Sequence, residues 1–278
     1  MNTRKALATL RTYVPPKWRR RLKSIYAQTP GYGRKTYYAG YGEDAFLQGY
    51  FQRKLAFLSS QKKTPATDLR KAVTPGYYVD LGAHAPRFYS NTYWFYRQGW
   101  RGINVDAAPG TQKLFAKIRP DDVTLEALVS DQETEMTFYY WDTPFLVNTL
   151  SAEYAQYLAR SWGQEPKTIV MRSCRLDTIL AEHLPQNQEI SFMSIDVEGH
   201  DVSVLRSNDW NRFRPELVLA EDLSMSFENA AASEMHQFMR QVGYEIYAWL
   251  RPTVVYRQIG LRDWLVHDFH APKAAAAE

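Results

Sequence analysis

Short apolar runs alternate with amphipathic segments along most of this chain. The apolar runs have the length of buried strands and lie at 76–81, 102–106, 123–129, 190–196 and 215–220. The segments between them show the helical spacing of apolar side chains and lie at 93–98, 109–118, 176–182, 200–205 and 233–242. Strands that alternate with helices predict an α/β, doubly wound, Rossmann-like fold.

Two regions depart from this alternation. Strand-like runs at 136–141 and 168–175 enclose a loop and helix at 148–161. We therefore expect a small insertion between core strands, which builds one wall of the substrate site. Near the C-terminal end, the runs 244–249 and 253–258 are separated by a short turn, and this spacing predicts an antiparallel pair of strands.

The two ends of the chain differ in composition from its middle. We expect residues 1–40 to form a basic N-terminal extension and residues 41–270 the folded domain, which opens with a helix in its first eighteen residues. The segment 271–278 contains four alanines in a row, and we expect it to be a disordered tail.

The N-terminal extension and the domain differ in the sign of their net charge. The net charge is +4, yet ten Lys and Arg residues precede the first acid, Glu43, so the remainder carries −6. The basic segment 17–23 fits a solvated helix, or peripheral binding to the inner face of a membrane or to a glycan-assembly complex. It contains no nucleic-acid-binding motif.

Composition narrows the class of protein further. Hydrophobic residues make up 45% of the chain and charged residues 23%, which is typical of globular proteins. No apolar run is long enough to cross a bilayer. The single cysteine, Cys174, cannot form an internal disulfide, so we expect a cytoplasmic protein. The oligomeric state stays open.

Acidic residues follow nearly every core strand. They are Asp80, Asp106, Asp131, Asp196 and the pair Glu221-Asp222. Because the carboxyl ends of parallel strands share one edge of a sheet, these acids favour a cationic or hydroxyl-rich ligand. The turn Gly82-Ala83-His84 lacks the three glycines of a dinucleotide-binding fingerprint. S-adenosylmethionine fits this pattern, because it carries a ribose diol, an ammonium and a sulfonium but no phosphate.

Several short motifs resemble those of the FkbM-type methyltransferases, a branch of the class I S-adenosylmethionine-dependent enzymes. The resemblance covers about 41–259, and its most specific part is Ile195-Asp196-Val197-Glu198-Gly199-His200. The other matching motifs are Tyr41-Gly42-Glu43-Asp44, Val79-Asp80-Leu81-Gly82-Ala83-His84, Ser90-Asn91-Thr92 and Gly99-Trp100-Arg101-Gly102. One departure lies at Asp106, where the family commonly has a glutamate followed by proline.

The resemblance implies a seven-stranded sheet with an antiparallel last strand, and methyl transfer to an oxygen, often that of a sugar hydroxyl. It assigns the methionine end of the cofactor to Asp80 and Gly82, the ribose to Asp106, and the surroundings of the adenine to Ser130 and Asp131. Further candidate cofactor contacts are Ala83, Asn91, Asp196 and Glu43.

A sugar hydroxyl is a poor nucleophile until its proton leaves, so the reaction calls for a base or a metal ion. In one interpretation His200 is the base, and Glu198 or Asp201 orients it; Asp196 and Glu198 complete the catalytic candidates. In the other, Asp196, Glu221 and Asp222 bind Mg²⁺, Mn²⁺ or Ca²⁺. The two interpretations are compatible.

The acceptor is less well defined by the sequence. Tyr139, Tyr140, Trp141 and Trp162 either stack on sugar rings or belong to the core. A glycan or glycosylated natural product, as in polysaccharide biosynthesis, follows from the resemblance. The alternatives are a small-molecule or lipid O- or N-methyltransferase, and a non-catalytic module that binds S-adenosylmethionine or glycans.

Overall fold

The computed structural model describes residues 36–61, 75–141 and 147–261. The fold presented here belongs to the unit that begins at Tyr38. Both the basic N-terminal extension, as far as residue 35, and the expected C-terminal tail lie outside the described residues. The proposals of membrane or complex contact through residues 17–23 therefore stay predictions. No helix within the described ranges is long and apolar enough to span a membrane.

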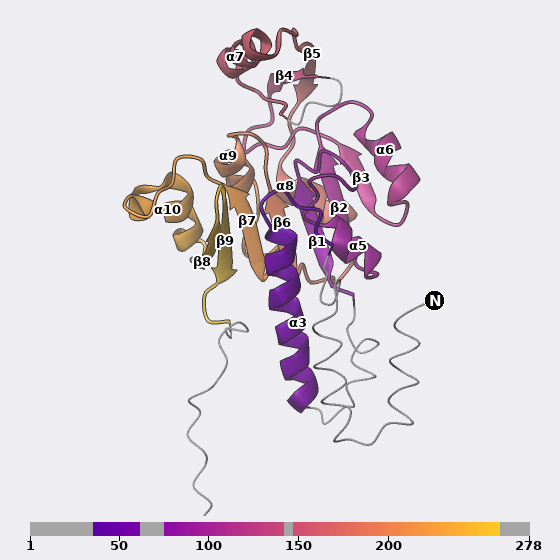
Figure 1. Cartoon of the computed structure of the whole chain (residues 1–278), viewed down its shortest axis with the longest axis vertical. Helices are drawn as coiled ribbons and strands as arrows, with labels where there is room; N and C mark the ends of the chain where they lie inside the picture. The colour runs from indigo at the N-terminus through magenta and orange to yellow at the C-terminus, as the bar shows by residue number, and fades with distance from the viewer. Residues whose placement is uncertain (1–35, 62–74, 142–146, 262–278) are drawn as a thin grey trace, which may run out of the picture. The chain divides into compact units, whose positions relative to one another are not determined.

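A seven-stranded sheet forms the centre of the fold, in the order β3-β2-β1-β6-β7-β9-β8 (Figure 1). Its strands are β1 (Tyr77–Leu81), β2 (Arg101–Asp106), β3 (Val123–Glu126), β6 (Phe192–Ile195), β7 (Leu217–Glu221), β8 (Tyr244–Leu250) and β9 (Thr253–Gln258). The first five of these run parallel to one another, and β9 is antiparallel to both β7 and β8. The predicted α/β fold with an antiparallel last strand is confirmed.

Helices cover both faces of this sheet. Leu47 of α3 (Glu43–Gln61) and Phe95 of α5 (Tyr93–Arg97) pack in one apolar cluster, together with Tyr78 of β1. The other cluster includes Val79 and apolar residues of α8 (Leu176–His183), α9 (Asp201–Arg206) and α10 (Glu234–Gln241). Successive residues of β1 thus point to opposite helical layers, as the geometry of a strand requires.

Two further helical segments lie in the connections of the fold. Helix α6 (Thr111–Ile118) follows β2, and its Phe115 is fully buried. A 3₁₀ turn, η1 (Ala230–Ala232), precedes α10. The loop before it follows β7 at the carboxyl end of the core strands.

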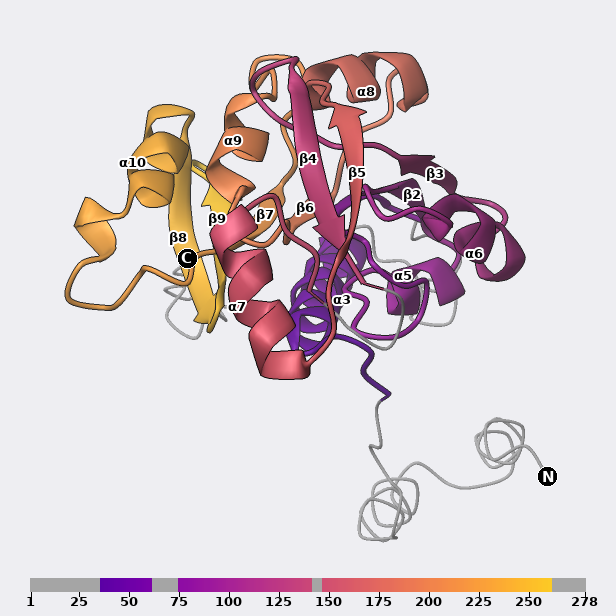
Figure 2. The same ribbon diagram turned by 90° about the horizontal axis from the view of Figure 1, so that it is seen from above.

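The predicted insertion is a separate two-stranded sheet with one helix. Strands β4 (Glu135–Tyr140) and β5 (Lys167–Arg172) pair antiparallel, and α7 (Ala152–Trp162) lies between them in the chain. Figures 1 and 2 show the insertion standing over the carboxyl ends of the core strands. Trp141 is buried, donates from Nε1 to the carbonyl of Gln164 at 3.0 Å, and meets Trp162 edge-on. These two tryptophans therefore belong to the core of the insertion.

One strand boundary differs from the prediction in a way that affects the site. The sequence predicts a strand over 123–129, but β3 ends at Glu126. Its partner β2 ends opposite that residue, since Asp106 pairs with Glu126. Residues 127–129 therefore leave the sheet, and they line the cavity described below.

Candidate active site

A cavity of about 250 Å³ lies at the carboxyl ends of β1, β2, β6 and β7. Its other walls come from residues 127–129 and from the insertion, through Phe138 and residues 147–150. This volume lies just below the usual range of ligand pockets, roughly 300–1,000 Å³. The insertion thus forms a wall of the cavity, as the sequence led us to expect.

Gly82 forms the floor of this cavity where three strand ends converge. Its N–H and that of Ala83 both donate to the carbonyl of Val105, at 2.9 and 3.2 Å. The φ of Gly82 is +74°, and a Cβ at this position would lie 1.7 Å from the carbonyl oxygen of Asp196. Only glycine fits here without displacing β1 from β6, because other residues rarely adopt this φ and none could avoid that oxygen.

We expect Gly82→Ala to weaken binding of the predicted cofactor, S-adenosylmethionine, by about 5- to 150-fold, because strain of about 1–3 kcal/mol falls on the cavity floor. Isothermal titration calorimetry would measure the dissociation constant of S-adenosylmethionine for each variant. Gly260→Ala is the matched control, because Gly260 has a φ of +87° with nothing within 4 Å of the added Cβ. Equal affinities for the two variants would contradict a requirement for close approach at Gly82.

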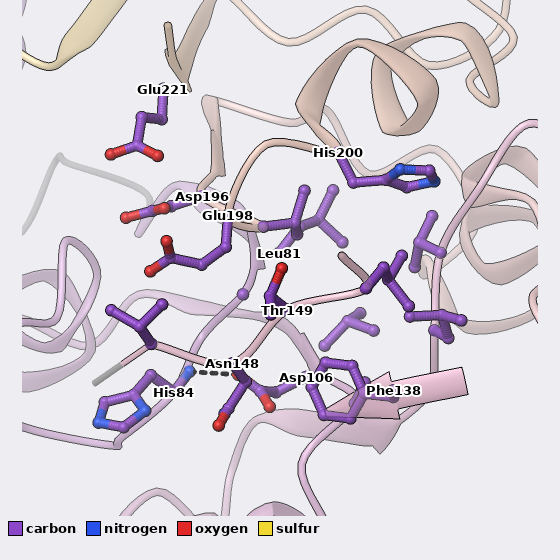
Figure 3. A pocket seen from close by; sticks show the side chains of 18 of the residues that line it. Leu81, His84, Asp106, Phe138, Asn148, Thr149, Asp196, Glu198, His200 and Glu221 are labelled. Atoms are coloured by element: carbon purple, nitrogen blue, oxygen red, sulfur yellow. Dashed lines mark hydrogen bonds between the residues drawn. The ribbon is translucent and has the colours of Figure 1, made fainter. Parts of the chain in front are cut away.

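Asp106 joins the turn after β1 to the loop after β2. Its Oδ2 accepts the N–H of His84 at 2.7 Å, and its Oδ1 accepts the N–H of Ala108 at 2.8 Å. Burial raises the pKa of Asp106, and these two hydrogen bonds oppose that effect. Asp106 lines the cavity, and each of its carboxylate oxygens retains a second lone pair that could accept a hydrogen bond from a ligand hydroxyl. The backbone of His84 thus helps to hold Asp106, while its ring lines the cavity (Figure 3).

An apolar wall closes the cavity beside Asp106. It consists of Leu128, Val129 and Phe138 with their neighbours, and it suits a flat aromatic ring such as adenine. Ser130 and Asp131, predicted to lie near the adenine, follow this wall but do not line the cavity. Ser130 is buried, and its Oγ lies 3.1 Å from Nε2 of His200.

The structure places four other predicted cofactor contacts outside the cavity lining. Asp80 accepts a hydrogen bond from Oγ1 of Thr92 at 2.6 Å, because its position in β1 directs it to the α3 and α5 layer. Asn91 donates to Oγ of Ser194, and Ala83 is buried. Glu43 is also buried and accepts from Oγ1 of Thr253.

Three carboxylates gather at one end of the cavity, and they come from neighbouring strands. Asp196 and Glu198 follow β6, and Glu221 ends β7 (Figure 3). Burial and the charges of Glu221 and Asp201 raise the pKa of Glu198 to about 8. The pKa of Asp196 also lies well above its ordinary value, because of burial and then the charges of Glu221 and Glu198, although part of this residue faces the open cavity.

Asp201 supports the turn that carries these acids. It is buried, and its carboxylate accepts the N–H groups of Val197 and Gly199 at 3.4 and 3.3 Å. Burial and Glu221 raise its pKa to about 7. Glu198 has a φ of +56°, an unfavourable value for a side chain of this kind. The turn therefore holds Glu198 in a strained backbone conformation at the cavity, which is typical of functional residues.

The raised pKa values predict that the apoprotein loses stability as the pH rises from about 5 to about 8, between the ordinary pKa values of these acids and their raised values in the folded state. The folded state holds protons on Glu198 and Asp201 that the unfolded chain has already released, so unfolding gains from each rise in pH. Thermal unfolding of the apoprotein at several pH values would measure how the unfolding temperature falls with pH. In Glu198→Gln this fall should be smaller. An unfolding temperature that rises with pH over this range would contradict the prediction.

The predicted metal site at Asp196, Glu221 and Asp222 finds no support in the described residues, because Asp222 does not line the cavity with the other two acids. Asp222 is buried and uses its carboxylate within the following loop. Its Oδ1 accepts the N–H groups of Ser224 and Met225, both at 3.0 Å, and its Oδ2 accepts from Oγ of Ser233 at 2.6 Å. Adjacent residues of an extended chain point to opposite sides, so Glu221 faces the cavity and Asp222 does not. Among the described residues, no three His, Cys, Asp or Glu side chains are grouped to hold a metal ion.

His200 lines the cavity but lies apart from the three carboxylates. In Figure 3 its ring is turned away from Asp196 and Glu198, toward Ser130. Burial lowers the pKa of His200, and the charge of Asp131 opposes this. Neither Glu198 nor Asp201 is hydrogen-bonded to its ring, so the expected orienting contact is not formed.

Several cavity residues escaped the sequence analysis. Tyr41 and Tyr89 lie at the cavity and are 66% and 50% exposed, whereas Asn148 and Thr149 belong to the insertion wall. Two sequence signals could have pointed to three of these residues. Tyr41 belongs to one of the matching motifs, and Asn148 and Thr149 belong to the predicted wall. No sequence signal pointed to Tyr89, because its φ of +52° is known only from the structure.

Comparison with known proteins was made on sequence and on structure. The family model described as "Methyltransferase FkbM domain" matches residues 80–246. No curated protein matches the sequence. Among solved structures, the apo form of a TDP-rhamnose 3'-O-methyltransferase of calicheamicin biosynthesis aligns with 13% identity and a TM-score of 0.30, over 90% of this chain and 99% of that chain.

Proposed function

The chain belongs to the FkbM methyltransferase family, and from that premise we propose that it transfers a methyl group from S-adenosylmethionine to a hydroxyl oxygen of a sugar. The observation that carries this proposal is the meeting of Asp196, Glu198 and Glu221 beside the Gly82 turn in one cavity. Carboxylates favour a cationic ligand there. The pKa of each of these acids is raised, which is typical of a functional site.

The described residues fit the predicted cofactor. Asp106 would accept the ribose hydroxyls, the apolar wall at Leu128 and Phe138 would hold the adenine, and the backbone at Gly82 leaves room for close approach. The acids at Asp196 and Glu221 would neutralise the ammonium and sulfonium charges. When bound, S-adenosylmethionine supplies an activated methyl group and leaves as a neutral thioether.

We assign the role of general base to Glu198. A base must be deprotonated at the working pH and must still bind a proton firmly, so a pKa near the operating pH is optimal. Glu198 meets this requirement, because burial and its acidic neighbours raise its pKa to about 8. Its carboxylate would accept the proton of the acceptor hydroxyl as the oxygen attacks the methyl carbon.

His200, the base suggested by the sequence, is the second candidate for this role. The lowered pKa keeps its imidazole neutral at pH 7, and a neutral imidazole is able to accept a proton. Its contact with Ser130 Oγ argues instead for a role in holding the wall of the cavity. We therefore place His200 beside the cofactor end of the site and Glu198 at the acceptor end.

Mass spectrometry of surface polysaccharides would test the proposed function. Polysaccharides from the host organism with and without the gene should differ by one CH₂ unit on a sugar residue, and the purified protein with isotope-labelled S-adenosylmethionine should restore the difference. Labelling of lipids or small molecules alone would contradict the sugar acceptor. Tight cofactor binding with no transfer to any of these classes would indicate a binding module.

A further inference from the structure

Helix α7 presents two tyrosines on one side, and the core of the insertion does not need them. Its buried residues Ala155 and Leu158 pack in the cluster around Trp141. Tyr154 and Tyr157 are 39% and 61% exposed. Their spacing of three residues places them on the same face of the helix, and their rings are nearly parallel, at 10° with centroids 6.1 Å apart.

The first turn of α7 begins at the cavity wall. Residues 147–150 line the cavity, and Ser151 directly follows them and caps the helix by accepting the N–H of Tyr154 at 3.1 Å. The wall is itself fixed, because Thr149 and Tyr139 exchange two backbone hydrogen bonds of 2.9 Å. The first turn of α7, which carries Tyr154, therefore begins at a fixed part of the cavity wall.

The cavity end nearest to Tyr154 is the acidic one. Besides partial burial, the charges of Glu198, Tyr157 and Glu221 raise the pKa of Tyr154. Glu198 and Glu221 line the cavity, and α7 stands over the carboxyl end of β7, the strand that Glu221 ends (Figures 1 and 2).

We propose that Tyr154 and Tyr157 form a stacking platform for the uncharged pyranose ring of the acceptor, with Glu198 accepting a hydrogen bond from one of its hydroxyls. The apolar C–H face of a sugar packs well on aromatic rings, while its hydroxyls are donors that suit carboxylates. The acids repel an anionic sugar, so the platform favours neutral sugars over uronates and sugar phosphates. This inference rests on the proposed function and names the substrate class of the same site.

Saturation-transfer NMR would test the platform without turnover. The full-length protein, saturated with S-adenosylhomocysteine, would be mixed with the methyl glycosides of glucose, galactose and mannose, and separately with methyl glucuronoside. We expect signals from the neutral glycosides but not from the glucuronoside. The signals should disappear in Tyr154→Ala/Tyr157→Ala and persist in Tyr154→Phe/Tyr157→Phe, which keeps both rings.

Kinetics on the polysaccharide acceptor provide the second measurement. The double alanine variant should lower kcat/KM for the polysaccharide by about tenfold or more, with the affinity for S-adenosylmethionine unchanged. Val170→Ala, at an exposed apolar position on β5 of the same insertion, should change neither value. If the double variant does not fold, Tyr157→Ala alone, at the more exposed ring, should still lower kcat/KM.

The outcomes separate this inference from the proposed function. Unchanged kcat/KM and unchanged NMR signals in the alanine variants would overturn the platform while leaving sugar methylation intact. Equal binding of methyl glucuronoside would overturn the preference for neutral sugars. Failure of the wild-type protein to methylate any polysaccharide would instead count against the proposed function.

Discussion

Replacing Glu198 by glutamine is expected to lower kcat for methyl transfer by about 10²–10⁴-fold, the usual contribution of a general base. Glutamine keeps the size of the side chain but cannot accept the proton of the hydroxyl. The affinity for S-adenosylmethionine should change much less, because Asp196 and Glu221 remain at the same end of the cavity. Steady-state kinetics and isothermal titration would measure the two effects separately.

The pH profile gives this prediction a direction. The deprotonated form of Glu198 is the active one, so kcat/KM of the wild type should rise with pH and level off above about pH 8. Glu221→Gln removes a like charge beside Glu198, which should lower the pKa of Glu198 and move the rise to lower pH. Glu198→Gln should remove the rise altogether.

His200→Ala is the comparison that decides between the two candidate bases. Because the ring of His200 contacts Ser130 and lies apart from the acids, we expect this variant to keep kcat within about tenfold of the wild type. A loss of activity in His200→Ala with near-normal activity in Glu198→Gln would reverse our assignment and restore the one suggested by the sequence.

Replacing Arg119 by alanine is expected to destabilise the fold by about 3–5 kcal/mol, because it leaves a buried carboxylate without its partner. The side chains of Arg119 and Asp122 are both fully buried, with Nε and Oδ2 2.9 Å apart. Arg119 also donates to the hydroxyls of Tyr78 and Thr92, at 2.9 and 3.0 Å. Thr92 in turn donates to Asp80, so one guanidinium supports two acids beneath the cavity floor.

Urea unfolding would measure the effect of Arg119→Ala. Arg101→Ala is the matched control, because Arg101 pairs with Asp121 at 2.8 Å while both side chains are largely exposed, and such pairs contribute about 0–1 kcal/mol. Arg119→Met with Asp122→Asn should cost less than Arg119→Ala alone, since it removes both charges. Equal losses for Arg119→Ala and Arg101→Ala would contradict the role of burial.

The course of the chain was largely predictable from its apolar pattern. Core strands and helices appear at nearly the predicted positions, since their side chains alternate between two buried layers and the periodicity records this. The end of β3 was not predictable, because it depends on where β2 ends. The burial of Trp141 was not predictable either. From the sequence alone, an aromatic residue of an insertion fits a ligand contact as well as a core position.

The candidate site was predictable as a region but not as a set of contacts. Gly82, Asp106, Asp196, Glu198, His200 and Glu221 all line the cavity, because the carboxyl ends of parallel strands meet at one edge. Asp80, Asn91 and Ser130 do not line the cavity. The position of a residue in a motif does not specify the direction in which its side chain points. For the same reason Asp222 does not line the cavity with Asp196 and Glu221.

The pattern of strands and terminal acids alone thus determined the fold class and the edge of the sheet where the cavity lies, because periodicity and strand direction are properties of the chain. Three-dimensional packing alone decided which acids share a pocket and raise one another's pKa. It also separated His200 from Glu198, only two residues apart, and brought residues 147–150 of the insertion into one cavity with the acids of the core. These relations depend on distances across the fold, which no local spacing records.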